Sequence, residues 1–238
     1  VQAIAIHPTE ENTVFASTNT EIVKTIDGGA TWNIVLTQSG MLATTLSFHP
    51  SSPDTIFAAA ETGLLKSADG GMTWATLLSG EFYDMQFQPN NGTIAYALGR
   101  NTTTDQYEFY KSTDGGTTFS LSMSGWGTYY EHSGAKMALT TADNQYLYVV
   151  LLTQDGTGNE NKPYILKSTD AGSTWVTVAT GLTTEFPMNN GQGYYDLAIL
   201  INDENKDELV VGTQIIYKST DGGANFVTLA DFSYTNTL

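Results

Sequence analysis

Residues Thr25–Trp32 read TIDGGATW, and this pattern returns four more times along the chain of 238 residues. The other copies are SADGGMTW at Ser67–Trp74, STDGGTTF at Ser112–Phe119, STDAGSTW at Ser168–Trp175 and STDGGANF at Ser219–Phe226. We call these five segments the boxes. The box aspartates are 42, 45, 56 and 51 residues apart. Repeats of about 40–50 residues are typical of the four-stranded blades of a β-propeller.

Each repeat places the same kinds of segment in the same order. In the first repeat an apolar run, AIAIHP at 3–8, ends in a proline turn and is followed by TVFAST at 13–18 and EIVKT at 21–25. The box then turns the chain, and TWNIVL at 31–36 closes the repeat. β-Branched and aromatic residues favour strands, whereas Gly, Asp, Asn and Pro mark turns, and no helical period of useful length occurs. The repeats therefore predict an all-β fold.

We interpret the chain as a β-propeller segment of five consecutive four-stranded blades, which is part of a larger propeller. The blades are expected at about 1–38, 39–80, 81–124, 125–181 and 182–232, and 233–238 is expected to begin the next unit. No spare strand that would close a ring is visible, and an open arc would expose strand edges and blade faces. We therefore expect further blades and further domains of the same chain.

The chemistry of the box suits a hairpin turn between the third and fourth strands of a blade. An Asp at the start of a turn accepts hydrogen bonds from the backbone N–H groups that follow, and Gly takes a positive φ without steric cost. The hydroxyl before the Asp can cap the same turn, and the aromatic residue after it buries a large apolar area. We therefore predict structural roles, rather than catalytic ones, for Asp27, Trp32, Asp69, Trp74, Asp114, Phe119, Asp170, Trp175, Asp221 and Phe226.

The charge balance excludes several partners. The chain carries 25 Asp and Glu against nine Lys and Arg, which is a net charge of −16. Such a chain repels phosphate groups, so we expect no binding to nucleic acid. No apolar run approaches the roughly 18 residues of a membrane span, so no membrane insertion is expected either. The chain has no cysteine, and its redox compartment cannot be inferred.

The five boxes resemble the Asp-box repeat, also called the bacterial neuraminidase (BNR) repeat, over essentially the whole chain. This repeat occurs in sialidases, in sortilin-type receptors, in xyloglucan-degrading endoglucanases and in secreted bacterial proteins. The resemblance implies a propeller of the sortilin and sialidase superfamily but leaves function open, because the repeat serves enzymes and receptors alike. In addition, GQGYYDLAI at Gly191–Ile199 and VVGTQIIYKSTDGG at Val210–Gly223 resemble large secreted Bacteroidetes proteins of type IX export. That resemblance implies an extracellular or cell-surface location.

Long connections at the end of the blades opposite the boxes are the expected place for a ligand, since loops on a rigid scaffold commonly carry function. The insertions Arg100–Tyr107 and Thr153–Pro163 and the links Ser122–Lys136 and Ala179–Asp196 all fall there. Their aromatic residues are candidates for stacking on a sugar or a peptide chain, namely Trp126, Tyr129, Tyr130, Tyr194 and Tyr195. The alternative role, packing between blades, has equal weight for Trp126 and Tyr130 and is favoured for Tyr194 and Tyr195.

A sialidase mechanism is excluded for this segment alone. Such an enzyme holds the substrate carboxylate with three arginines, and Arg100 is the only arginine in the chain. A xyloglucanase-type glycoside hydrolase needs two carboxylates across a cleft. Asp84, Glu131 and Asp196 are weak candidates for this role, in a catalytic set that further blades would complete.

No cofactor is expected and no metal site is predicted. His7 and His49 are isolated in proline turns, whereas zinc needs clustered ligands, so we interpret both as surface turn residues. Loose calcium binding is an open alternative near Asp155, Asn159 and Glu160, where oxygen ligands alternate along the chain.

The sequence therefore predicts an extracellular or cell-surface, non-catalytic recognition or adhesion module that binds a glycan or a protein partner through the long connections. Two alternatives stay open: a glycoside hydrolase whose catalytic residues are completed by further blades, and a structural stalk domain of a large surface protein. The three hypotheses differ in what they require of the link residues, because function is decided by a site and not by the fold.

Overall fold

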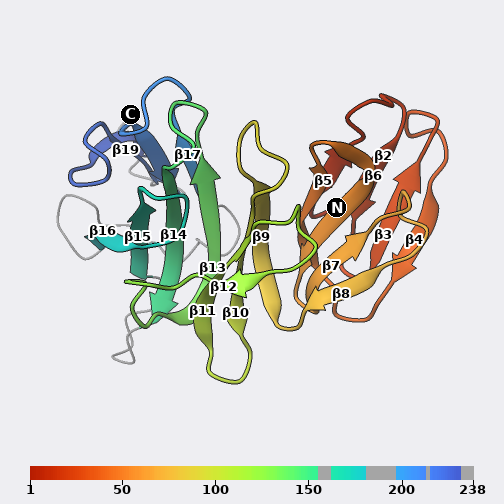
Figure 1. The fold of residues 1–238 in the computed structure, drawn as a ribbon, viewed down its shortest axis with the longest axis horizontal. Coiled ribbons are helices and arrows are strands. Elements are labelled where there is room, and N and C mark those ends of the chain that lie inside the picture. The colour runs from red at the N-terminus through yellow and green to blue at the C-terminus, as the bar shows by residue number, and fades with distance from the viewer. Residues whose placement is uncertain (155–161, 181–196, 213–214, 232–238) are drawn as a thin grey trace, which may run out of the picture. The chain divides into compact units, whose positions relative to one another are not determined.

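The computed structural model describes residues 1–154, 162–180, 197–212 and 215–231 (Figure 1). All the strands in these ranges belong to antiparallel sheets of consecutive strands. The prediction of an all-β chain with five four-stranded blades is confirmed. Among the described residues there is no helix that is long and apolar enough to cross a membrane.

Each blade contains four strands that follow one another in chain order. Blade 1 contains β1 (Ile4–Ile6), β2 (Val14–Ser17), β3 (Glu21–Thr25) and β4 (Asn33–Thr37). Blade 2 contains β5 (Ala43–His49), β6 (Ser52–Ala60), β7 (Gly63–Ser67) and β8 (Ala75–Leu78). Blade 3 contains β9 (Glu81–Phe87), β10 (Ala95–Asn101), β11 (Gln106–Ser112) and β12 (Ser120–Leu121). Blade 4 contains β13 (Tyr130–Leu139), β14 (Leu147–Gln154), β15 (Lys162–Ser168) and β16 (Val176–Thr180). Blade 5 contains β17 (Ala198–Ile201), β18 (Leu209–Gly212), β19 (Ile215–Ser219) and β20 (Val227–Asp231).

The chain divides into two compact units. The first unit comprises Val1–Thr104 and Glu108–Leu121, which hold blades 1 and 2 and most of blade 3. The second unit comprises Asp105–Tyr107 and Ser122–Leu238, which hold the start of β11 and blades 4 and 5.

The two ends of a blade carry different connections. In blade 1 the box meets the turn between β1 and β2, because the N–H of Gly28 donates to the carbonyl of Asn12 at 3.0 Å. The equivalent bond is 2.8–2.9 Å long in the other four blades. We call this the box end of a blade, and we call the opposite end, where one blade is linked to the next, the link end.

Antiparallel pairing sorts the side chains of each blade onto two faces. In blade 1 the register pairs Ile4 with Ala16, and it pairs Ala5 with Phe15 in the neighbouring row. Successive residues of a strand point to opposite faces of the sheet. We call the face that carries Ile4 the leading face of a blade and the face that carries Phe15 the trailing face. In each other blade, the residues that pair at the equivalent positions of the first two strands define the same two faces.

The core of the first unit lies where the trailing face of one blade meets the leading face of the next. Phe15 and Ile22 of blade 1 pack with Leu46, Ala58 and Leu65 of blade 2. The second strand of blade 2 is therefore buried on both faces, which explains why TIFAAA is apolar without alternation. Blade 2 covers blade 3 in the same way.

The same rule holds in the second unit. Tyr148 and Val150 of blade 4 pack with Val211 and Tyr217 of blade 5 in one buried cluster. Aromatic residues supply much of this area, and each large side chain that is fully buried stabilises the fold by about 1.5–3 kcal/mol relative to exposure.

Blade 3 departs from the pattern at its fourth strand. β12 has two residues, whereas the fourth strands of the other blades have four or five. Beyond Leu121 the chain belongs to the second unit, where Ser124 forms a parallel bridge with Thr174. In the same unit Gln106 at the start of β11 pairs with Tyr130 at the start of β13. The start of β11 is thus paired with the next blade instead of a fourth strand of its own.

Candidate functional site

The five boxes repeat one hydrogen-bond pattern. In the first box the hydroxyl of Thr25 donates to Oδ1 of Asp27 at 2.7 Å and accepts from the N–H of Gly29 at 3.0 Å. Thr31 donates its N–H to Oδ1 of Asp27 and its hydroxyl to Oδ2, at 2.9 and 2.7 Å. The bond from the hydroxyl to the aspartate is 2.7–2.8 Å long in all five boxes. Each box aspartate therefore holds its own turn together.

These hydrogen bonds change the acidity of the box aspartates. Donation by Thr31, first from its backbone and then from its side chain, lowers the pKa of Asp27 to about 2. Donation by Thr73 lowers the pKa of Asp69 to about 2. The pKa values of the other three box aspartates are lowered as well. A carboxylate with a lowered pKa and donors on both oxygens is well suited to hold a turn together and is a poor general acid at neutral pH.

Four aromatic rings, two of them from the link that precedes blade 4, lie in a column. The ring centroids of Trp175 and Trp126 are 4.9 Å apart, with an interplanar angle of 87°. The next ring, Tyr129, has its centroid 6.4 Å from that of Trp126 and 5.0 Å from that of Tyr164. Trp175 and Trp126 are buried, whereas Tyr129 and Tyr164 are half-buried. The column thus runs from the box of blade 4 toward its link end and becomes accessible there.

Trp126 forms the buried middle of this column. Its side chain is 1% exposed, and its Nε1–H donates to the carbonyl of Tyr107 at 3.1 Å. Gly125 and Gly127 bring it there with φ values of 76° and 82°, and a Cβ at Gly125 would collide with the carbonyl of Trp175. Of the two roles that had equal weight for Trp126, stacking on a ligand and packing between blades, the structure shows packing, beside the start of β11.

Tyr107 secures the start of blade 4. Its hydroxyl lies 2.7 Å from the carbonyl oxygens of Gly134 and Leu152, and it accepts from the N–H of Gly134 at 3.1 Å. The register of β13 and β14 shifts between Glu131 and Gly134. A bulge of this kind leaves ladder groups unpaired, and the buried hydroxyl of Tyr107 satisfies them. The hydrogen bonds of Tyr107 therefore fix the first and second strands of blade 4 at its link end.

The accessible part of the column consists of tyrosines. Tyr129 and Thr177 share a hydrogen bond of 2.5 Å between their hydroxyls, and Tyr130, the next residue, is 46% exposed. Tyr164 was not among the residues predicted from the sequence, because tyrosines inside a strand usually pack. The sequence feature that could have identified Tyr164 is its position directly after the insertion Thr153–Pro163. Half-buried tyrosines combine an apolar ring with a polar hydroxyl, and such a surface suits a sugar or a peptide chain.

Asp84, a weak catalytic candidate in the sequence, is held by hydrogen bonds on β9. Its side chain is buried on β9, where Oδ1 accepts from the N–H of Met85 at 2.9 Å and Oδ2 accepts from the side-chain amide of Gln86 at 3.1 Å. The hydroxyl of Thr45 on β5 lies 3.5 Å from Oδ1. Asp84 therefore joins two blades, and its candidate role in catalysis stays a prediction.

Several predicted residues lie outside the described part of the chain. They are Tyr194, Tyr195 and Asp196, the side chain of Glu131, and the candidate calcium ligands Asp155, Asn159 and Glu160. Within the described ranges no group of three or more His, Cys, Asp or Glu side chains is arranged to hold a metal ion.

The histidines of the proline turns pack between blades. The ring of His7 lies 5.2 Å from that of Phe48, and the ring of His49 lies 4.9 Å from that of Phe87, both edge-to-face. Phe48 and Phe87 belong to the first strand of the following blade. The expectation of surface turn histidines is corrected for His7, which is buried, because a side chain of the next blade covers it.

A charged group lies at the link ends of blades 2 and 3. Nε of Arg100 on β10 lies 2.6 Å from Oε2 of Glu81, which begins β9. Glu61 lies in the turn between β6 and β7 and is exposed. Desolvation by neighbouring groups raises its pKa, the carboxylate of Glu81 raises it further, and Arg100 opposes the shift. The sequence prediction overlooked both glutamates, because Glu61 lies in a short turn and Glu81 begins a strand, and neither belongs to a long connection. A carboxyl group with a raised pKa near an ion-paired carboxylate is an arrangement that acid–base chemistry can use.

Comparison with known proteins supports the fold. No family model matches the chain, and no curated protein matches it. A GH74 enzyme of Niastella koreensis matches with a TM-score of 0.65 at 21% identity, over 95% of this chain and 38% of that chain. The GH74 xyloglucanase of Xanthomonas campestris matches with a TM-score of 0.68 at 16% identity, over 97% of this chain and 38% of that chain. An ancestral GH74 enzyme matches with a TM-score of 0.70 at 14% identity, over 96% of this chain and 31% of that chain.

These likenesses define the class of protein. The chain has the fold of a β-propeller, and its five blades correspond to part of one, because it spans 31–38% of the length of these three enzymes. At such low identity the likeness extends to the fold alone, since one fold hosts many functions.

Proposed function

We propose that this chain is a glycan-binding part of an extracellular or cell-surface protein built from Asp-box blades, and that it binds without catalysis. The observation that carries the proposal is the half-buried ring pair Tyr129 and Tyr164 at the link end of blade 4, with the exposed Tyr130 beside it. The secreted Bacteroidetes origin inferred from the sequence belongs to the same proposal.

The chemistry of the pair fits a sugar. A pyranose ring stacks its C–H face on an aromatic ring and turns its hydroxyls toward polar groups, and a tyrosine offers both kinds of contact. The hydroxyls of Tyr129 and Thr177 lie at the edge of such a contact. The buried Trp126 behind Tyr129 fixes the ring in place, so little conformational entropy is lost on binding.

The charge of the chain favours a neutral glycan over an anionic polymer. A net charge of −16 repels nucleic acid and acidic polysaccharides, whereas it does not oppose a neutral polymer. Because the GH74 enzyme of Xanthomonas campestris with the same fold is a xyloglucanase, xyloglucan is the first polymer to test.

The test is affinity electrophoresis of the full chain in gels that contain xyloglucan or another neutral polysaccharide. Tyr164→Ala and Tyr129→Ala are each expected to weaken binding about tenfold, as loss of an aromatic anchor does. Tyr146→Ala is the matched control, because Tyr146 is a half-buried tyrosine that precedes β14, at the box end of the same blade. Unchanged retardation of Tyr164→Ala, or binding of peptides instead of any polysaccharide, would refute the proposal.

A second candidate function is glycoside hydrolysis, and the observation that favours it is the charged group at the link ends of blades 2 and 3. There Glu61 has a raised pKa beside Glu81, which forms an ion pair with Arg100. In this role Glu61 would protonate the leaving oxygen and Glu81 would act as the base or nucleophile.

The hydrolase hypothesis has its own test. Incubation of the chain with xyloglucan would release reducing ends, and Glu61→Gln and Glu81→Gln would each lower the rate by at least about a hundredfold, as loss of a general acid or base does. Glu108→Gln is the control, since Glu108 is a glutamate of β11 that bonds Tyr110 and Asn101. Turnover that survives both substitutions at Glu61 and Glu81 would remove this candidate.

A further inference from the structure

A lysine directly precedes the box in all five repeats. These residues are Lys24, Lys66, Lys111, Lys167 and Lys218. They make up five of the nine Lys and Arg residues of a chain whose net charge is −16. A cation that returns at one place in every repeat, in a chain with so few cations, indicates a repeated role for this position.

Between blades 1 and 2 this lysine joins the two blades. Nζ of Lys24, on β3, lies 5.3 Å from the centroid of the Phe15 ring in its own blade and donates to the carbonyl of Gly70 in the box of blade 2, at 3.0 Å. The next residue of that box, Gly71, approaches the same ring, because a Cβ there would lie 2.6 Å from Phe15. The ammonium thus combines a cation–π contact with a charge-assisted hydrogen bond to the following blade.

The interface between blades 2 and 3 has the same parts. Nζ of Lys66, on β7, lies 5.3 Å from the centroid of the Phe57 ring and donates to the carbonyl of Gly116 in the box of blade 3, at 3.2 Å. A Cβ at Gly116 would again lie 2.6 Å from the aromatic ring. The acceptor is the second glycine of the box here and the first glycine in blade 2, so the bond between blades recurs although its exact acceptor changes.

The same position in blade 4 also reaches the following blade. Nζ of Lys167 lies 5.4 Å from the centroid of the Tyr148 ring and donates to Oδ1 of Asp207, in the turn between β17 and β18 of blade 5, at 3.2 Å. In blade 5, by contrast, Nζ of Lys218 lies 2.7 Å from Oε1 of Glu208 in its own blade. The lysine before the box therefore bonds the next blade at three interfaces, with a carbonyl or a carboxylate as the acceptor.

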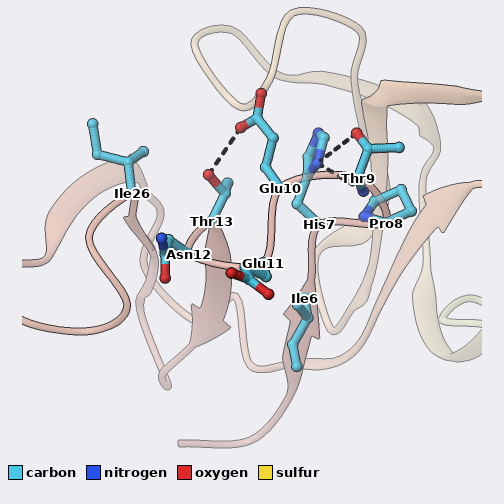
Figure 2. Close-up of a pocket in the computed structure, with 9 residues that line it drawn as sticks. All are labelled: Ile6, His7, Pro8, Thr9, Glu10, Glu11, Asn12, Thr13 and Ile26. Carbon is cyan, nitrogen blue, oxygen red and sulfur yellow. Dashed lines mark hydrogen bonds between the residues drawn. The ribbon is translucent and has the colours of Figure 1, made fainter.

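The turn between the first two strands of a blade lies in the same contact. Figure 2 shows this turn in blade 1, where the backbone N–H of Thr9 donates to Nδ1 of His7 at 3.4 Å. The ring of His7 meets Phe48 of blade 2 edge-to-face at 5.2 Å, and Phe48 lies 5.7 Å from Phe15. Phe15 thus contacts both Phe48 and Lys24, so the ring packing and the lysine bond belong to one contact between the blades.

We infer that Lys24 and Lys66, the coupling lysines, each control the opening of one interface between neighbouring blades. Each coupling lysine joins one strand to a box that is 46 or 50 residues further along the chain. Its own strand stays paired through the backbone whatever the side chain is, as the registers of β3 with β2 and of β7 with β6 show. In repeat architectures the stability is a sum of repeats and nearest-neighbour interfaces, so loss of one lysine weakens one interface and leaves the blades folded.

The test is thiol labelling of the full chain, which has no cysteine of its own. Ala58→Cys places a thiol where blade 2 packs on blade 1, and Ala97→Cys places one at the equivalent position of blade 3, where it packs on blade 2. Both alanines are fully buried, and cysteine behaves as a small apolar residue in such sites. The rate of modification without denaturant therefore reports how often each interface opens.

The two coupling lysines are expected to act on different reporters. Lys24→Met should raise the labelling rate of the Ala58→Cys variant at least about tenfold and leave that of the Ala97→Cys variant unchanged, because it removes a hydrogen bond from a charged donor at one interface. Lys66→Met should have the converse effect. Lys24→Arg keeps a cation with donors and should restore slow labelling. Lys218→Met is the control for loss of a positive charge, since Lys218 bonds within its own blade.

The other outcomes contradict the inference. A Lys24→Met variant that labels both reporters faster, or that fails to fold, would show that the lysine supports the whole chain and not one interface. A variant that labels neither reporter faster would show that ring packing alone holds the blades together. Equal labelling of the Lys24→Arg and Lys24→Met variants would overturn the role of the cation.

Discussion

The box ends and the link ends of the blades follow opposite rules. At the box end all five blades repeat the same hydroxyl, carboxylate and glycine contacts within a tenth of an ångström for the hydroxyl-to-aspartate bond. At the link end the described connections vary in length and content, and blade 4 carries the column from Trp126 to Tyr164. The boxes therefore stabilise the blades in the same way each time, whereas the described connections at the opposite end vary from blade to blade.

The largest effect is expected for Trp126→Ala. Removal of this buried ring would leave a cavity beside Tyr107 and lower the free energy of unfolding by about 3–5 kcal/mol. Trp32→Ala, in a box whose ring is 45% exposed, is expected to cost about 1 kcal/mol or less. Denaturant titration of both variants measures the difference. Equal losses would show that the link-end column is no more important for stability than an exposed box ring.

Alanine substitutions at Gly29 and Gly71 distinguish two roles of the box: forming its own turn and leaving room for the preceding blade. Gly71 and Gly29 both have a positive φ, of 87° and 95°, so alanine at either position costs about 1–2 kcal/mol. Only Gly71→Ala would also clash with Phe15 of the preceding blade, which adds about 1–3 kcal/mol. Thermal and denaturant unfolding are expected to show that the Gly71→Ala variant is clearly less stable than the Gly29→Ala variant. If the two variants are equally stable, the second glycine serves the turn alone.

The box end is also expected to govern acid stability. The folded pKa values of Asp27 and Asp69 are about 2, which is below the ordinary value of 3.8. A lowered folded pKa contributes stability that is present above the ordinary pKa and is lost as the pH falls through the folded value. The free energy of unfolding should therefore decrease between about pH 4 and pH 2.

The control for acid stability is the isosteric change Asp69→Asn. This variant is expected to be less stable than the wild type at neutral pH and to show a shallower decrease in acid, because one of the contributing carboxylates is absent. A wild-type free energy of unfolding that stays constant down to pH 2 would contradict the assignment of these contacts.

The smallest effect is expected for Tyr129→Phe at the link end. The variant loses the hydrogen bond to Thr177 but keeps the ring contacts with Trp126 and Tyr164, so stability should fall by about 1 kcal/mol or less. Binding of a neutral glycan should weaken less than in Tyr129→Ala. Calorimetry of both variants distinguishes a ring that stacks from a hydroxyl that binds, and an equal loss in both variants would assign the contact to the hydroxyl.

Much of the fold could be predicted because its signals are local. A hydroxyl two residues before Asp, a glycine two residues after it and a hydroxyl or amide four residues after it close a hydrogen-bonded turn within eight residues. Five such turns at blade spacing predict five blades without any long-range information. The aromatic residues of the link were also recognisable, although their division between packing and binding was not.

The residues that were misplaced depend on distant parts of the chain. Trp126 is buried because β12 stops after two residues, and Tyr164 contacts Tyr129 because the link before β13 brings Tyr129 against it. His7 is buried because Phe48, more than forty residues away, covers it. No periodicity or motif encodes these contacts, because each one depends on which side chains the blade faces bring together.

The amino-acid sequence alone determines the turn, the strand order and the number of blades, because these follow from hydrogen bonds and side-chain alternation between near neighbours. The tertiary structure alone decides which faces are covered, which tyrosines stay accessible and which carboxyl groups are buried. Those properties arise where one blade meets another or where the chain passes from blade to blade, and packing there depends on the shapes of both partners.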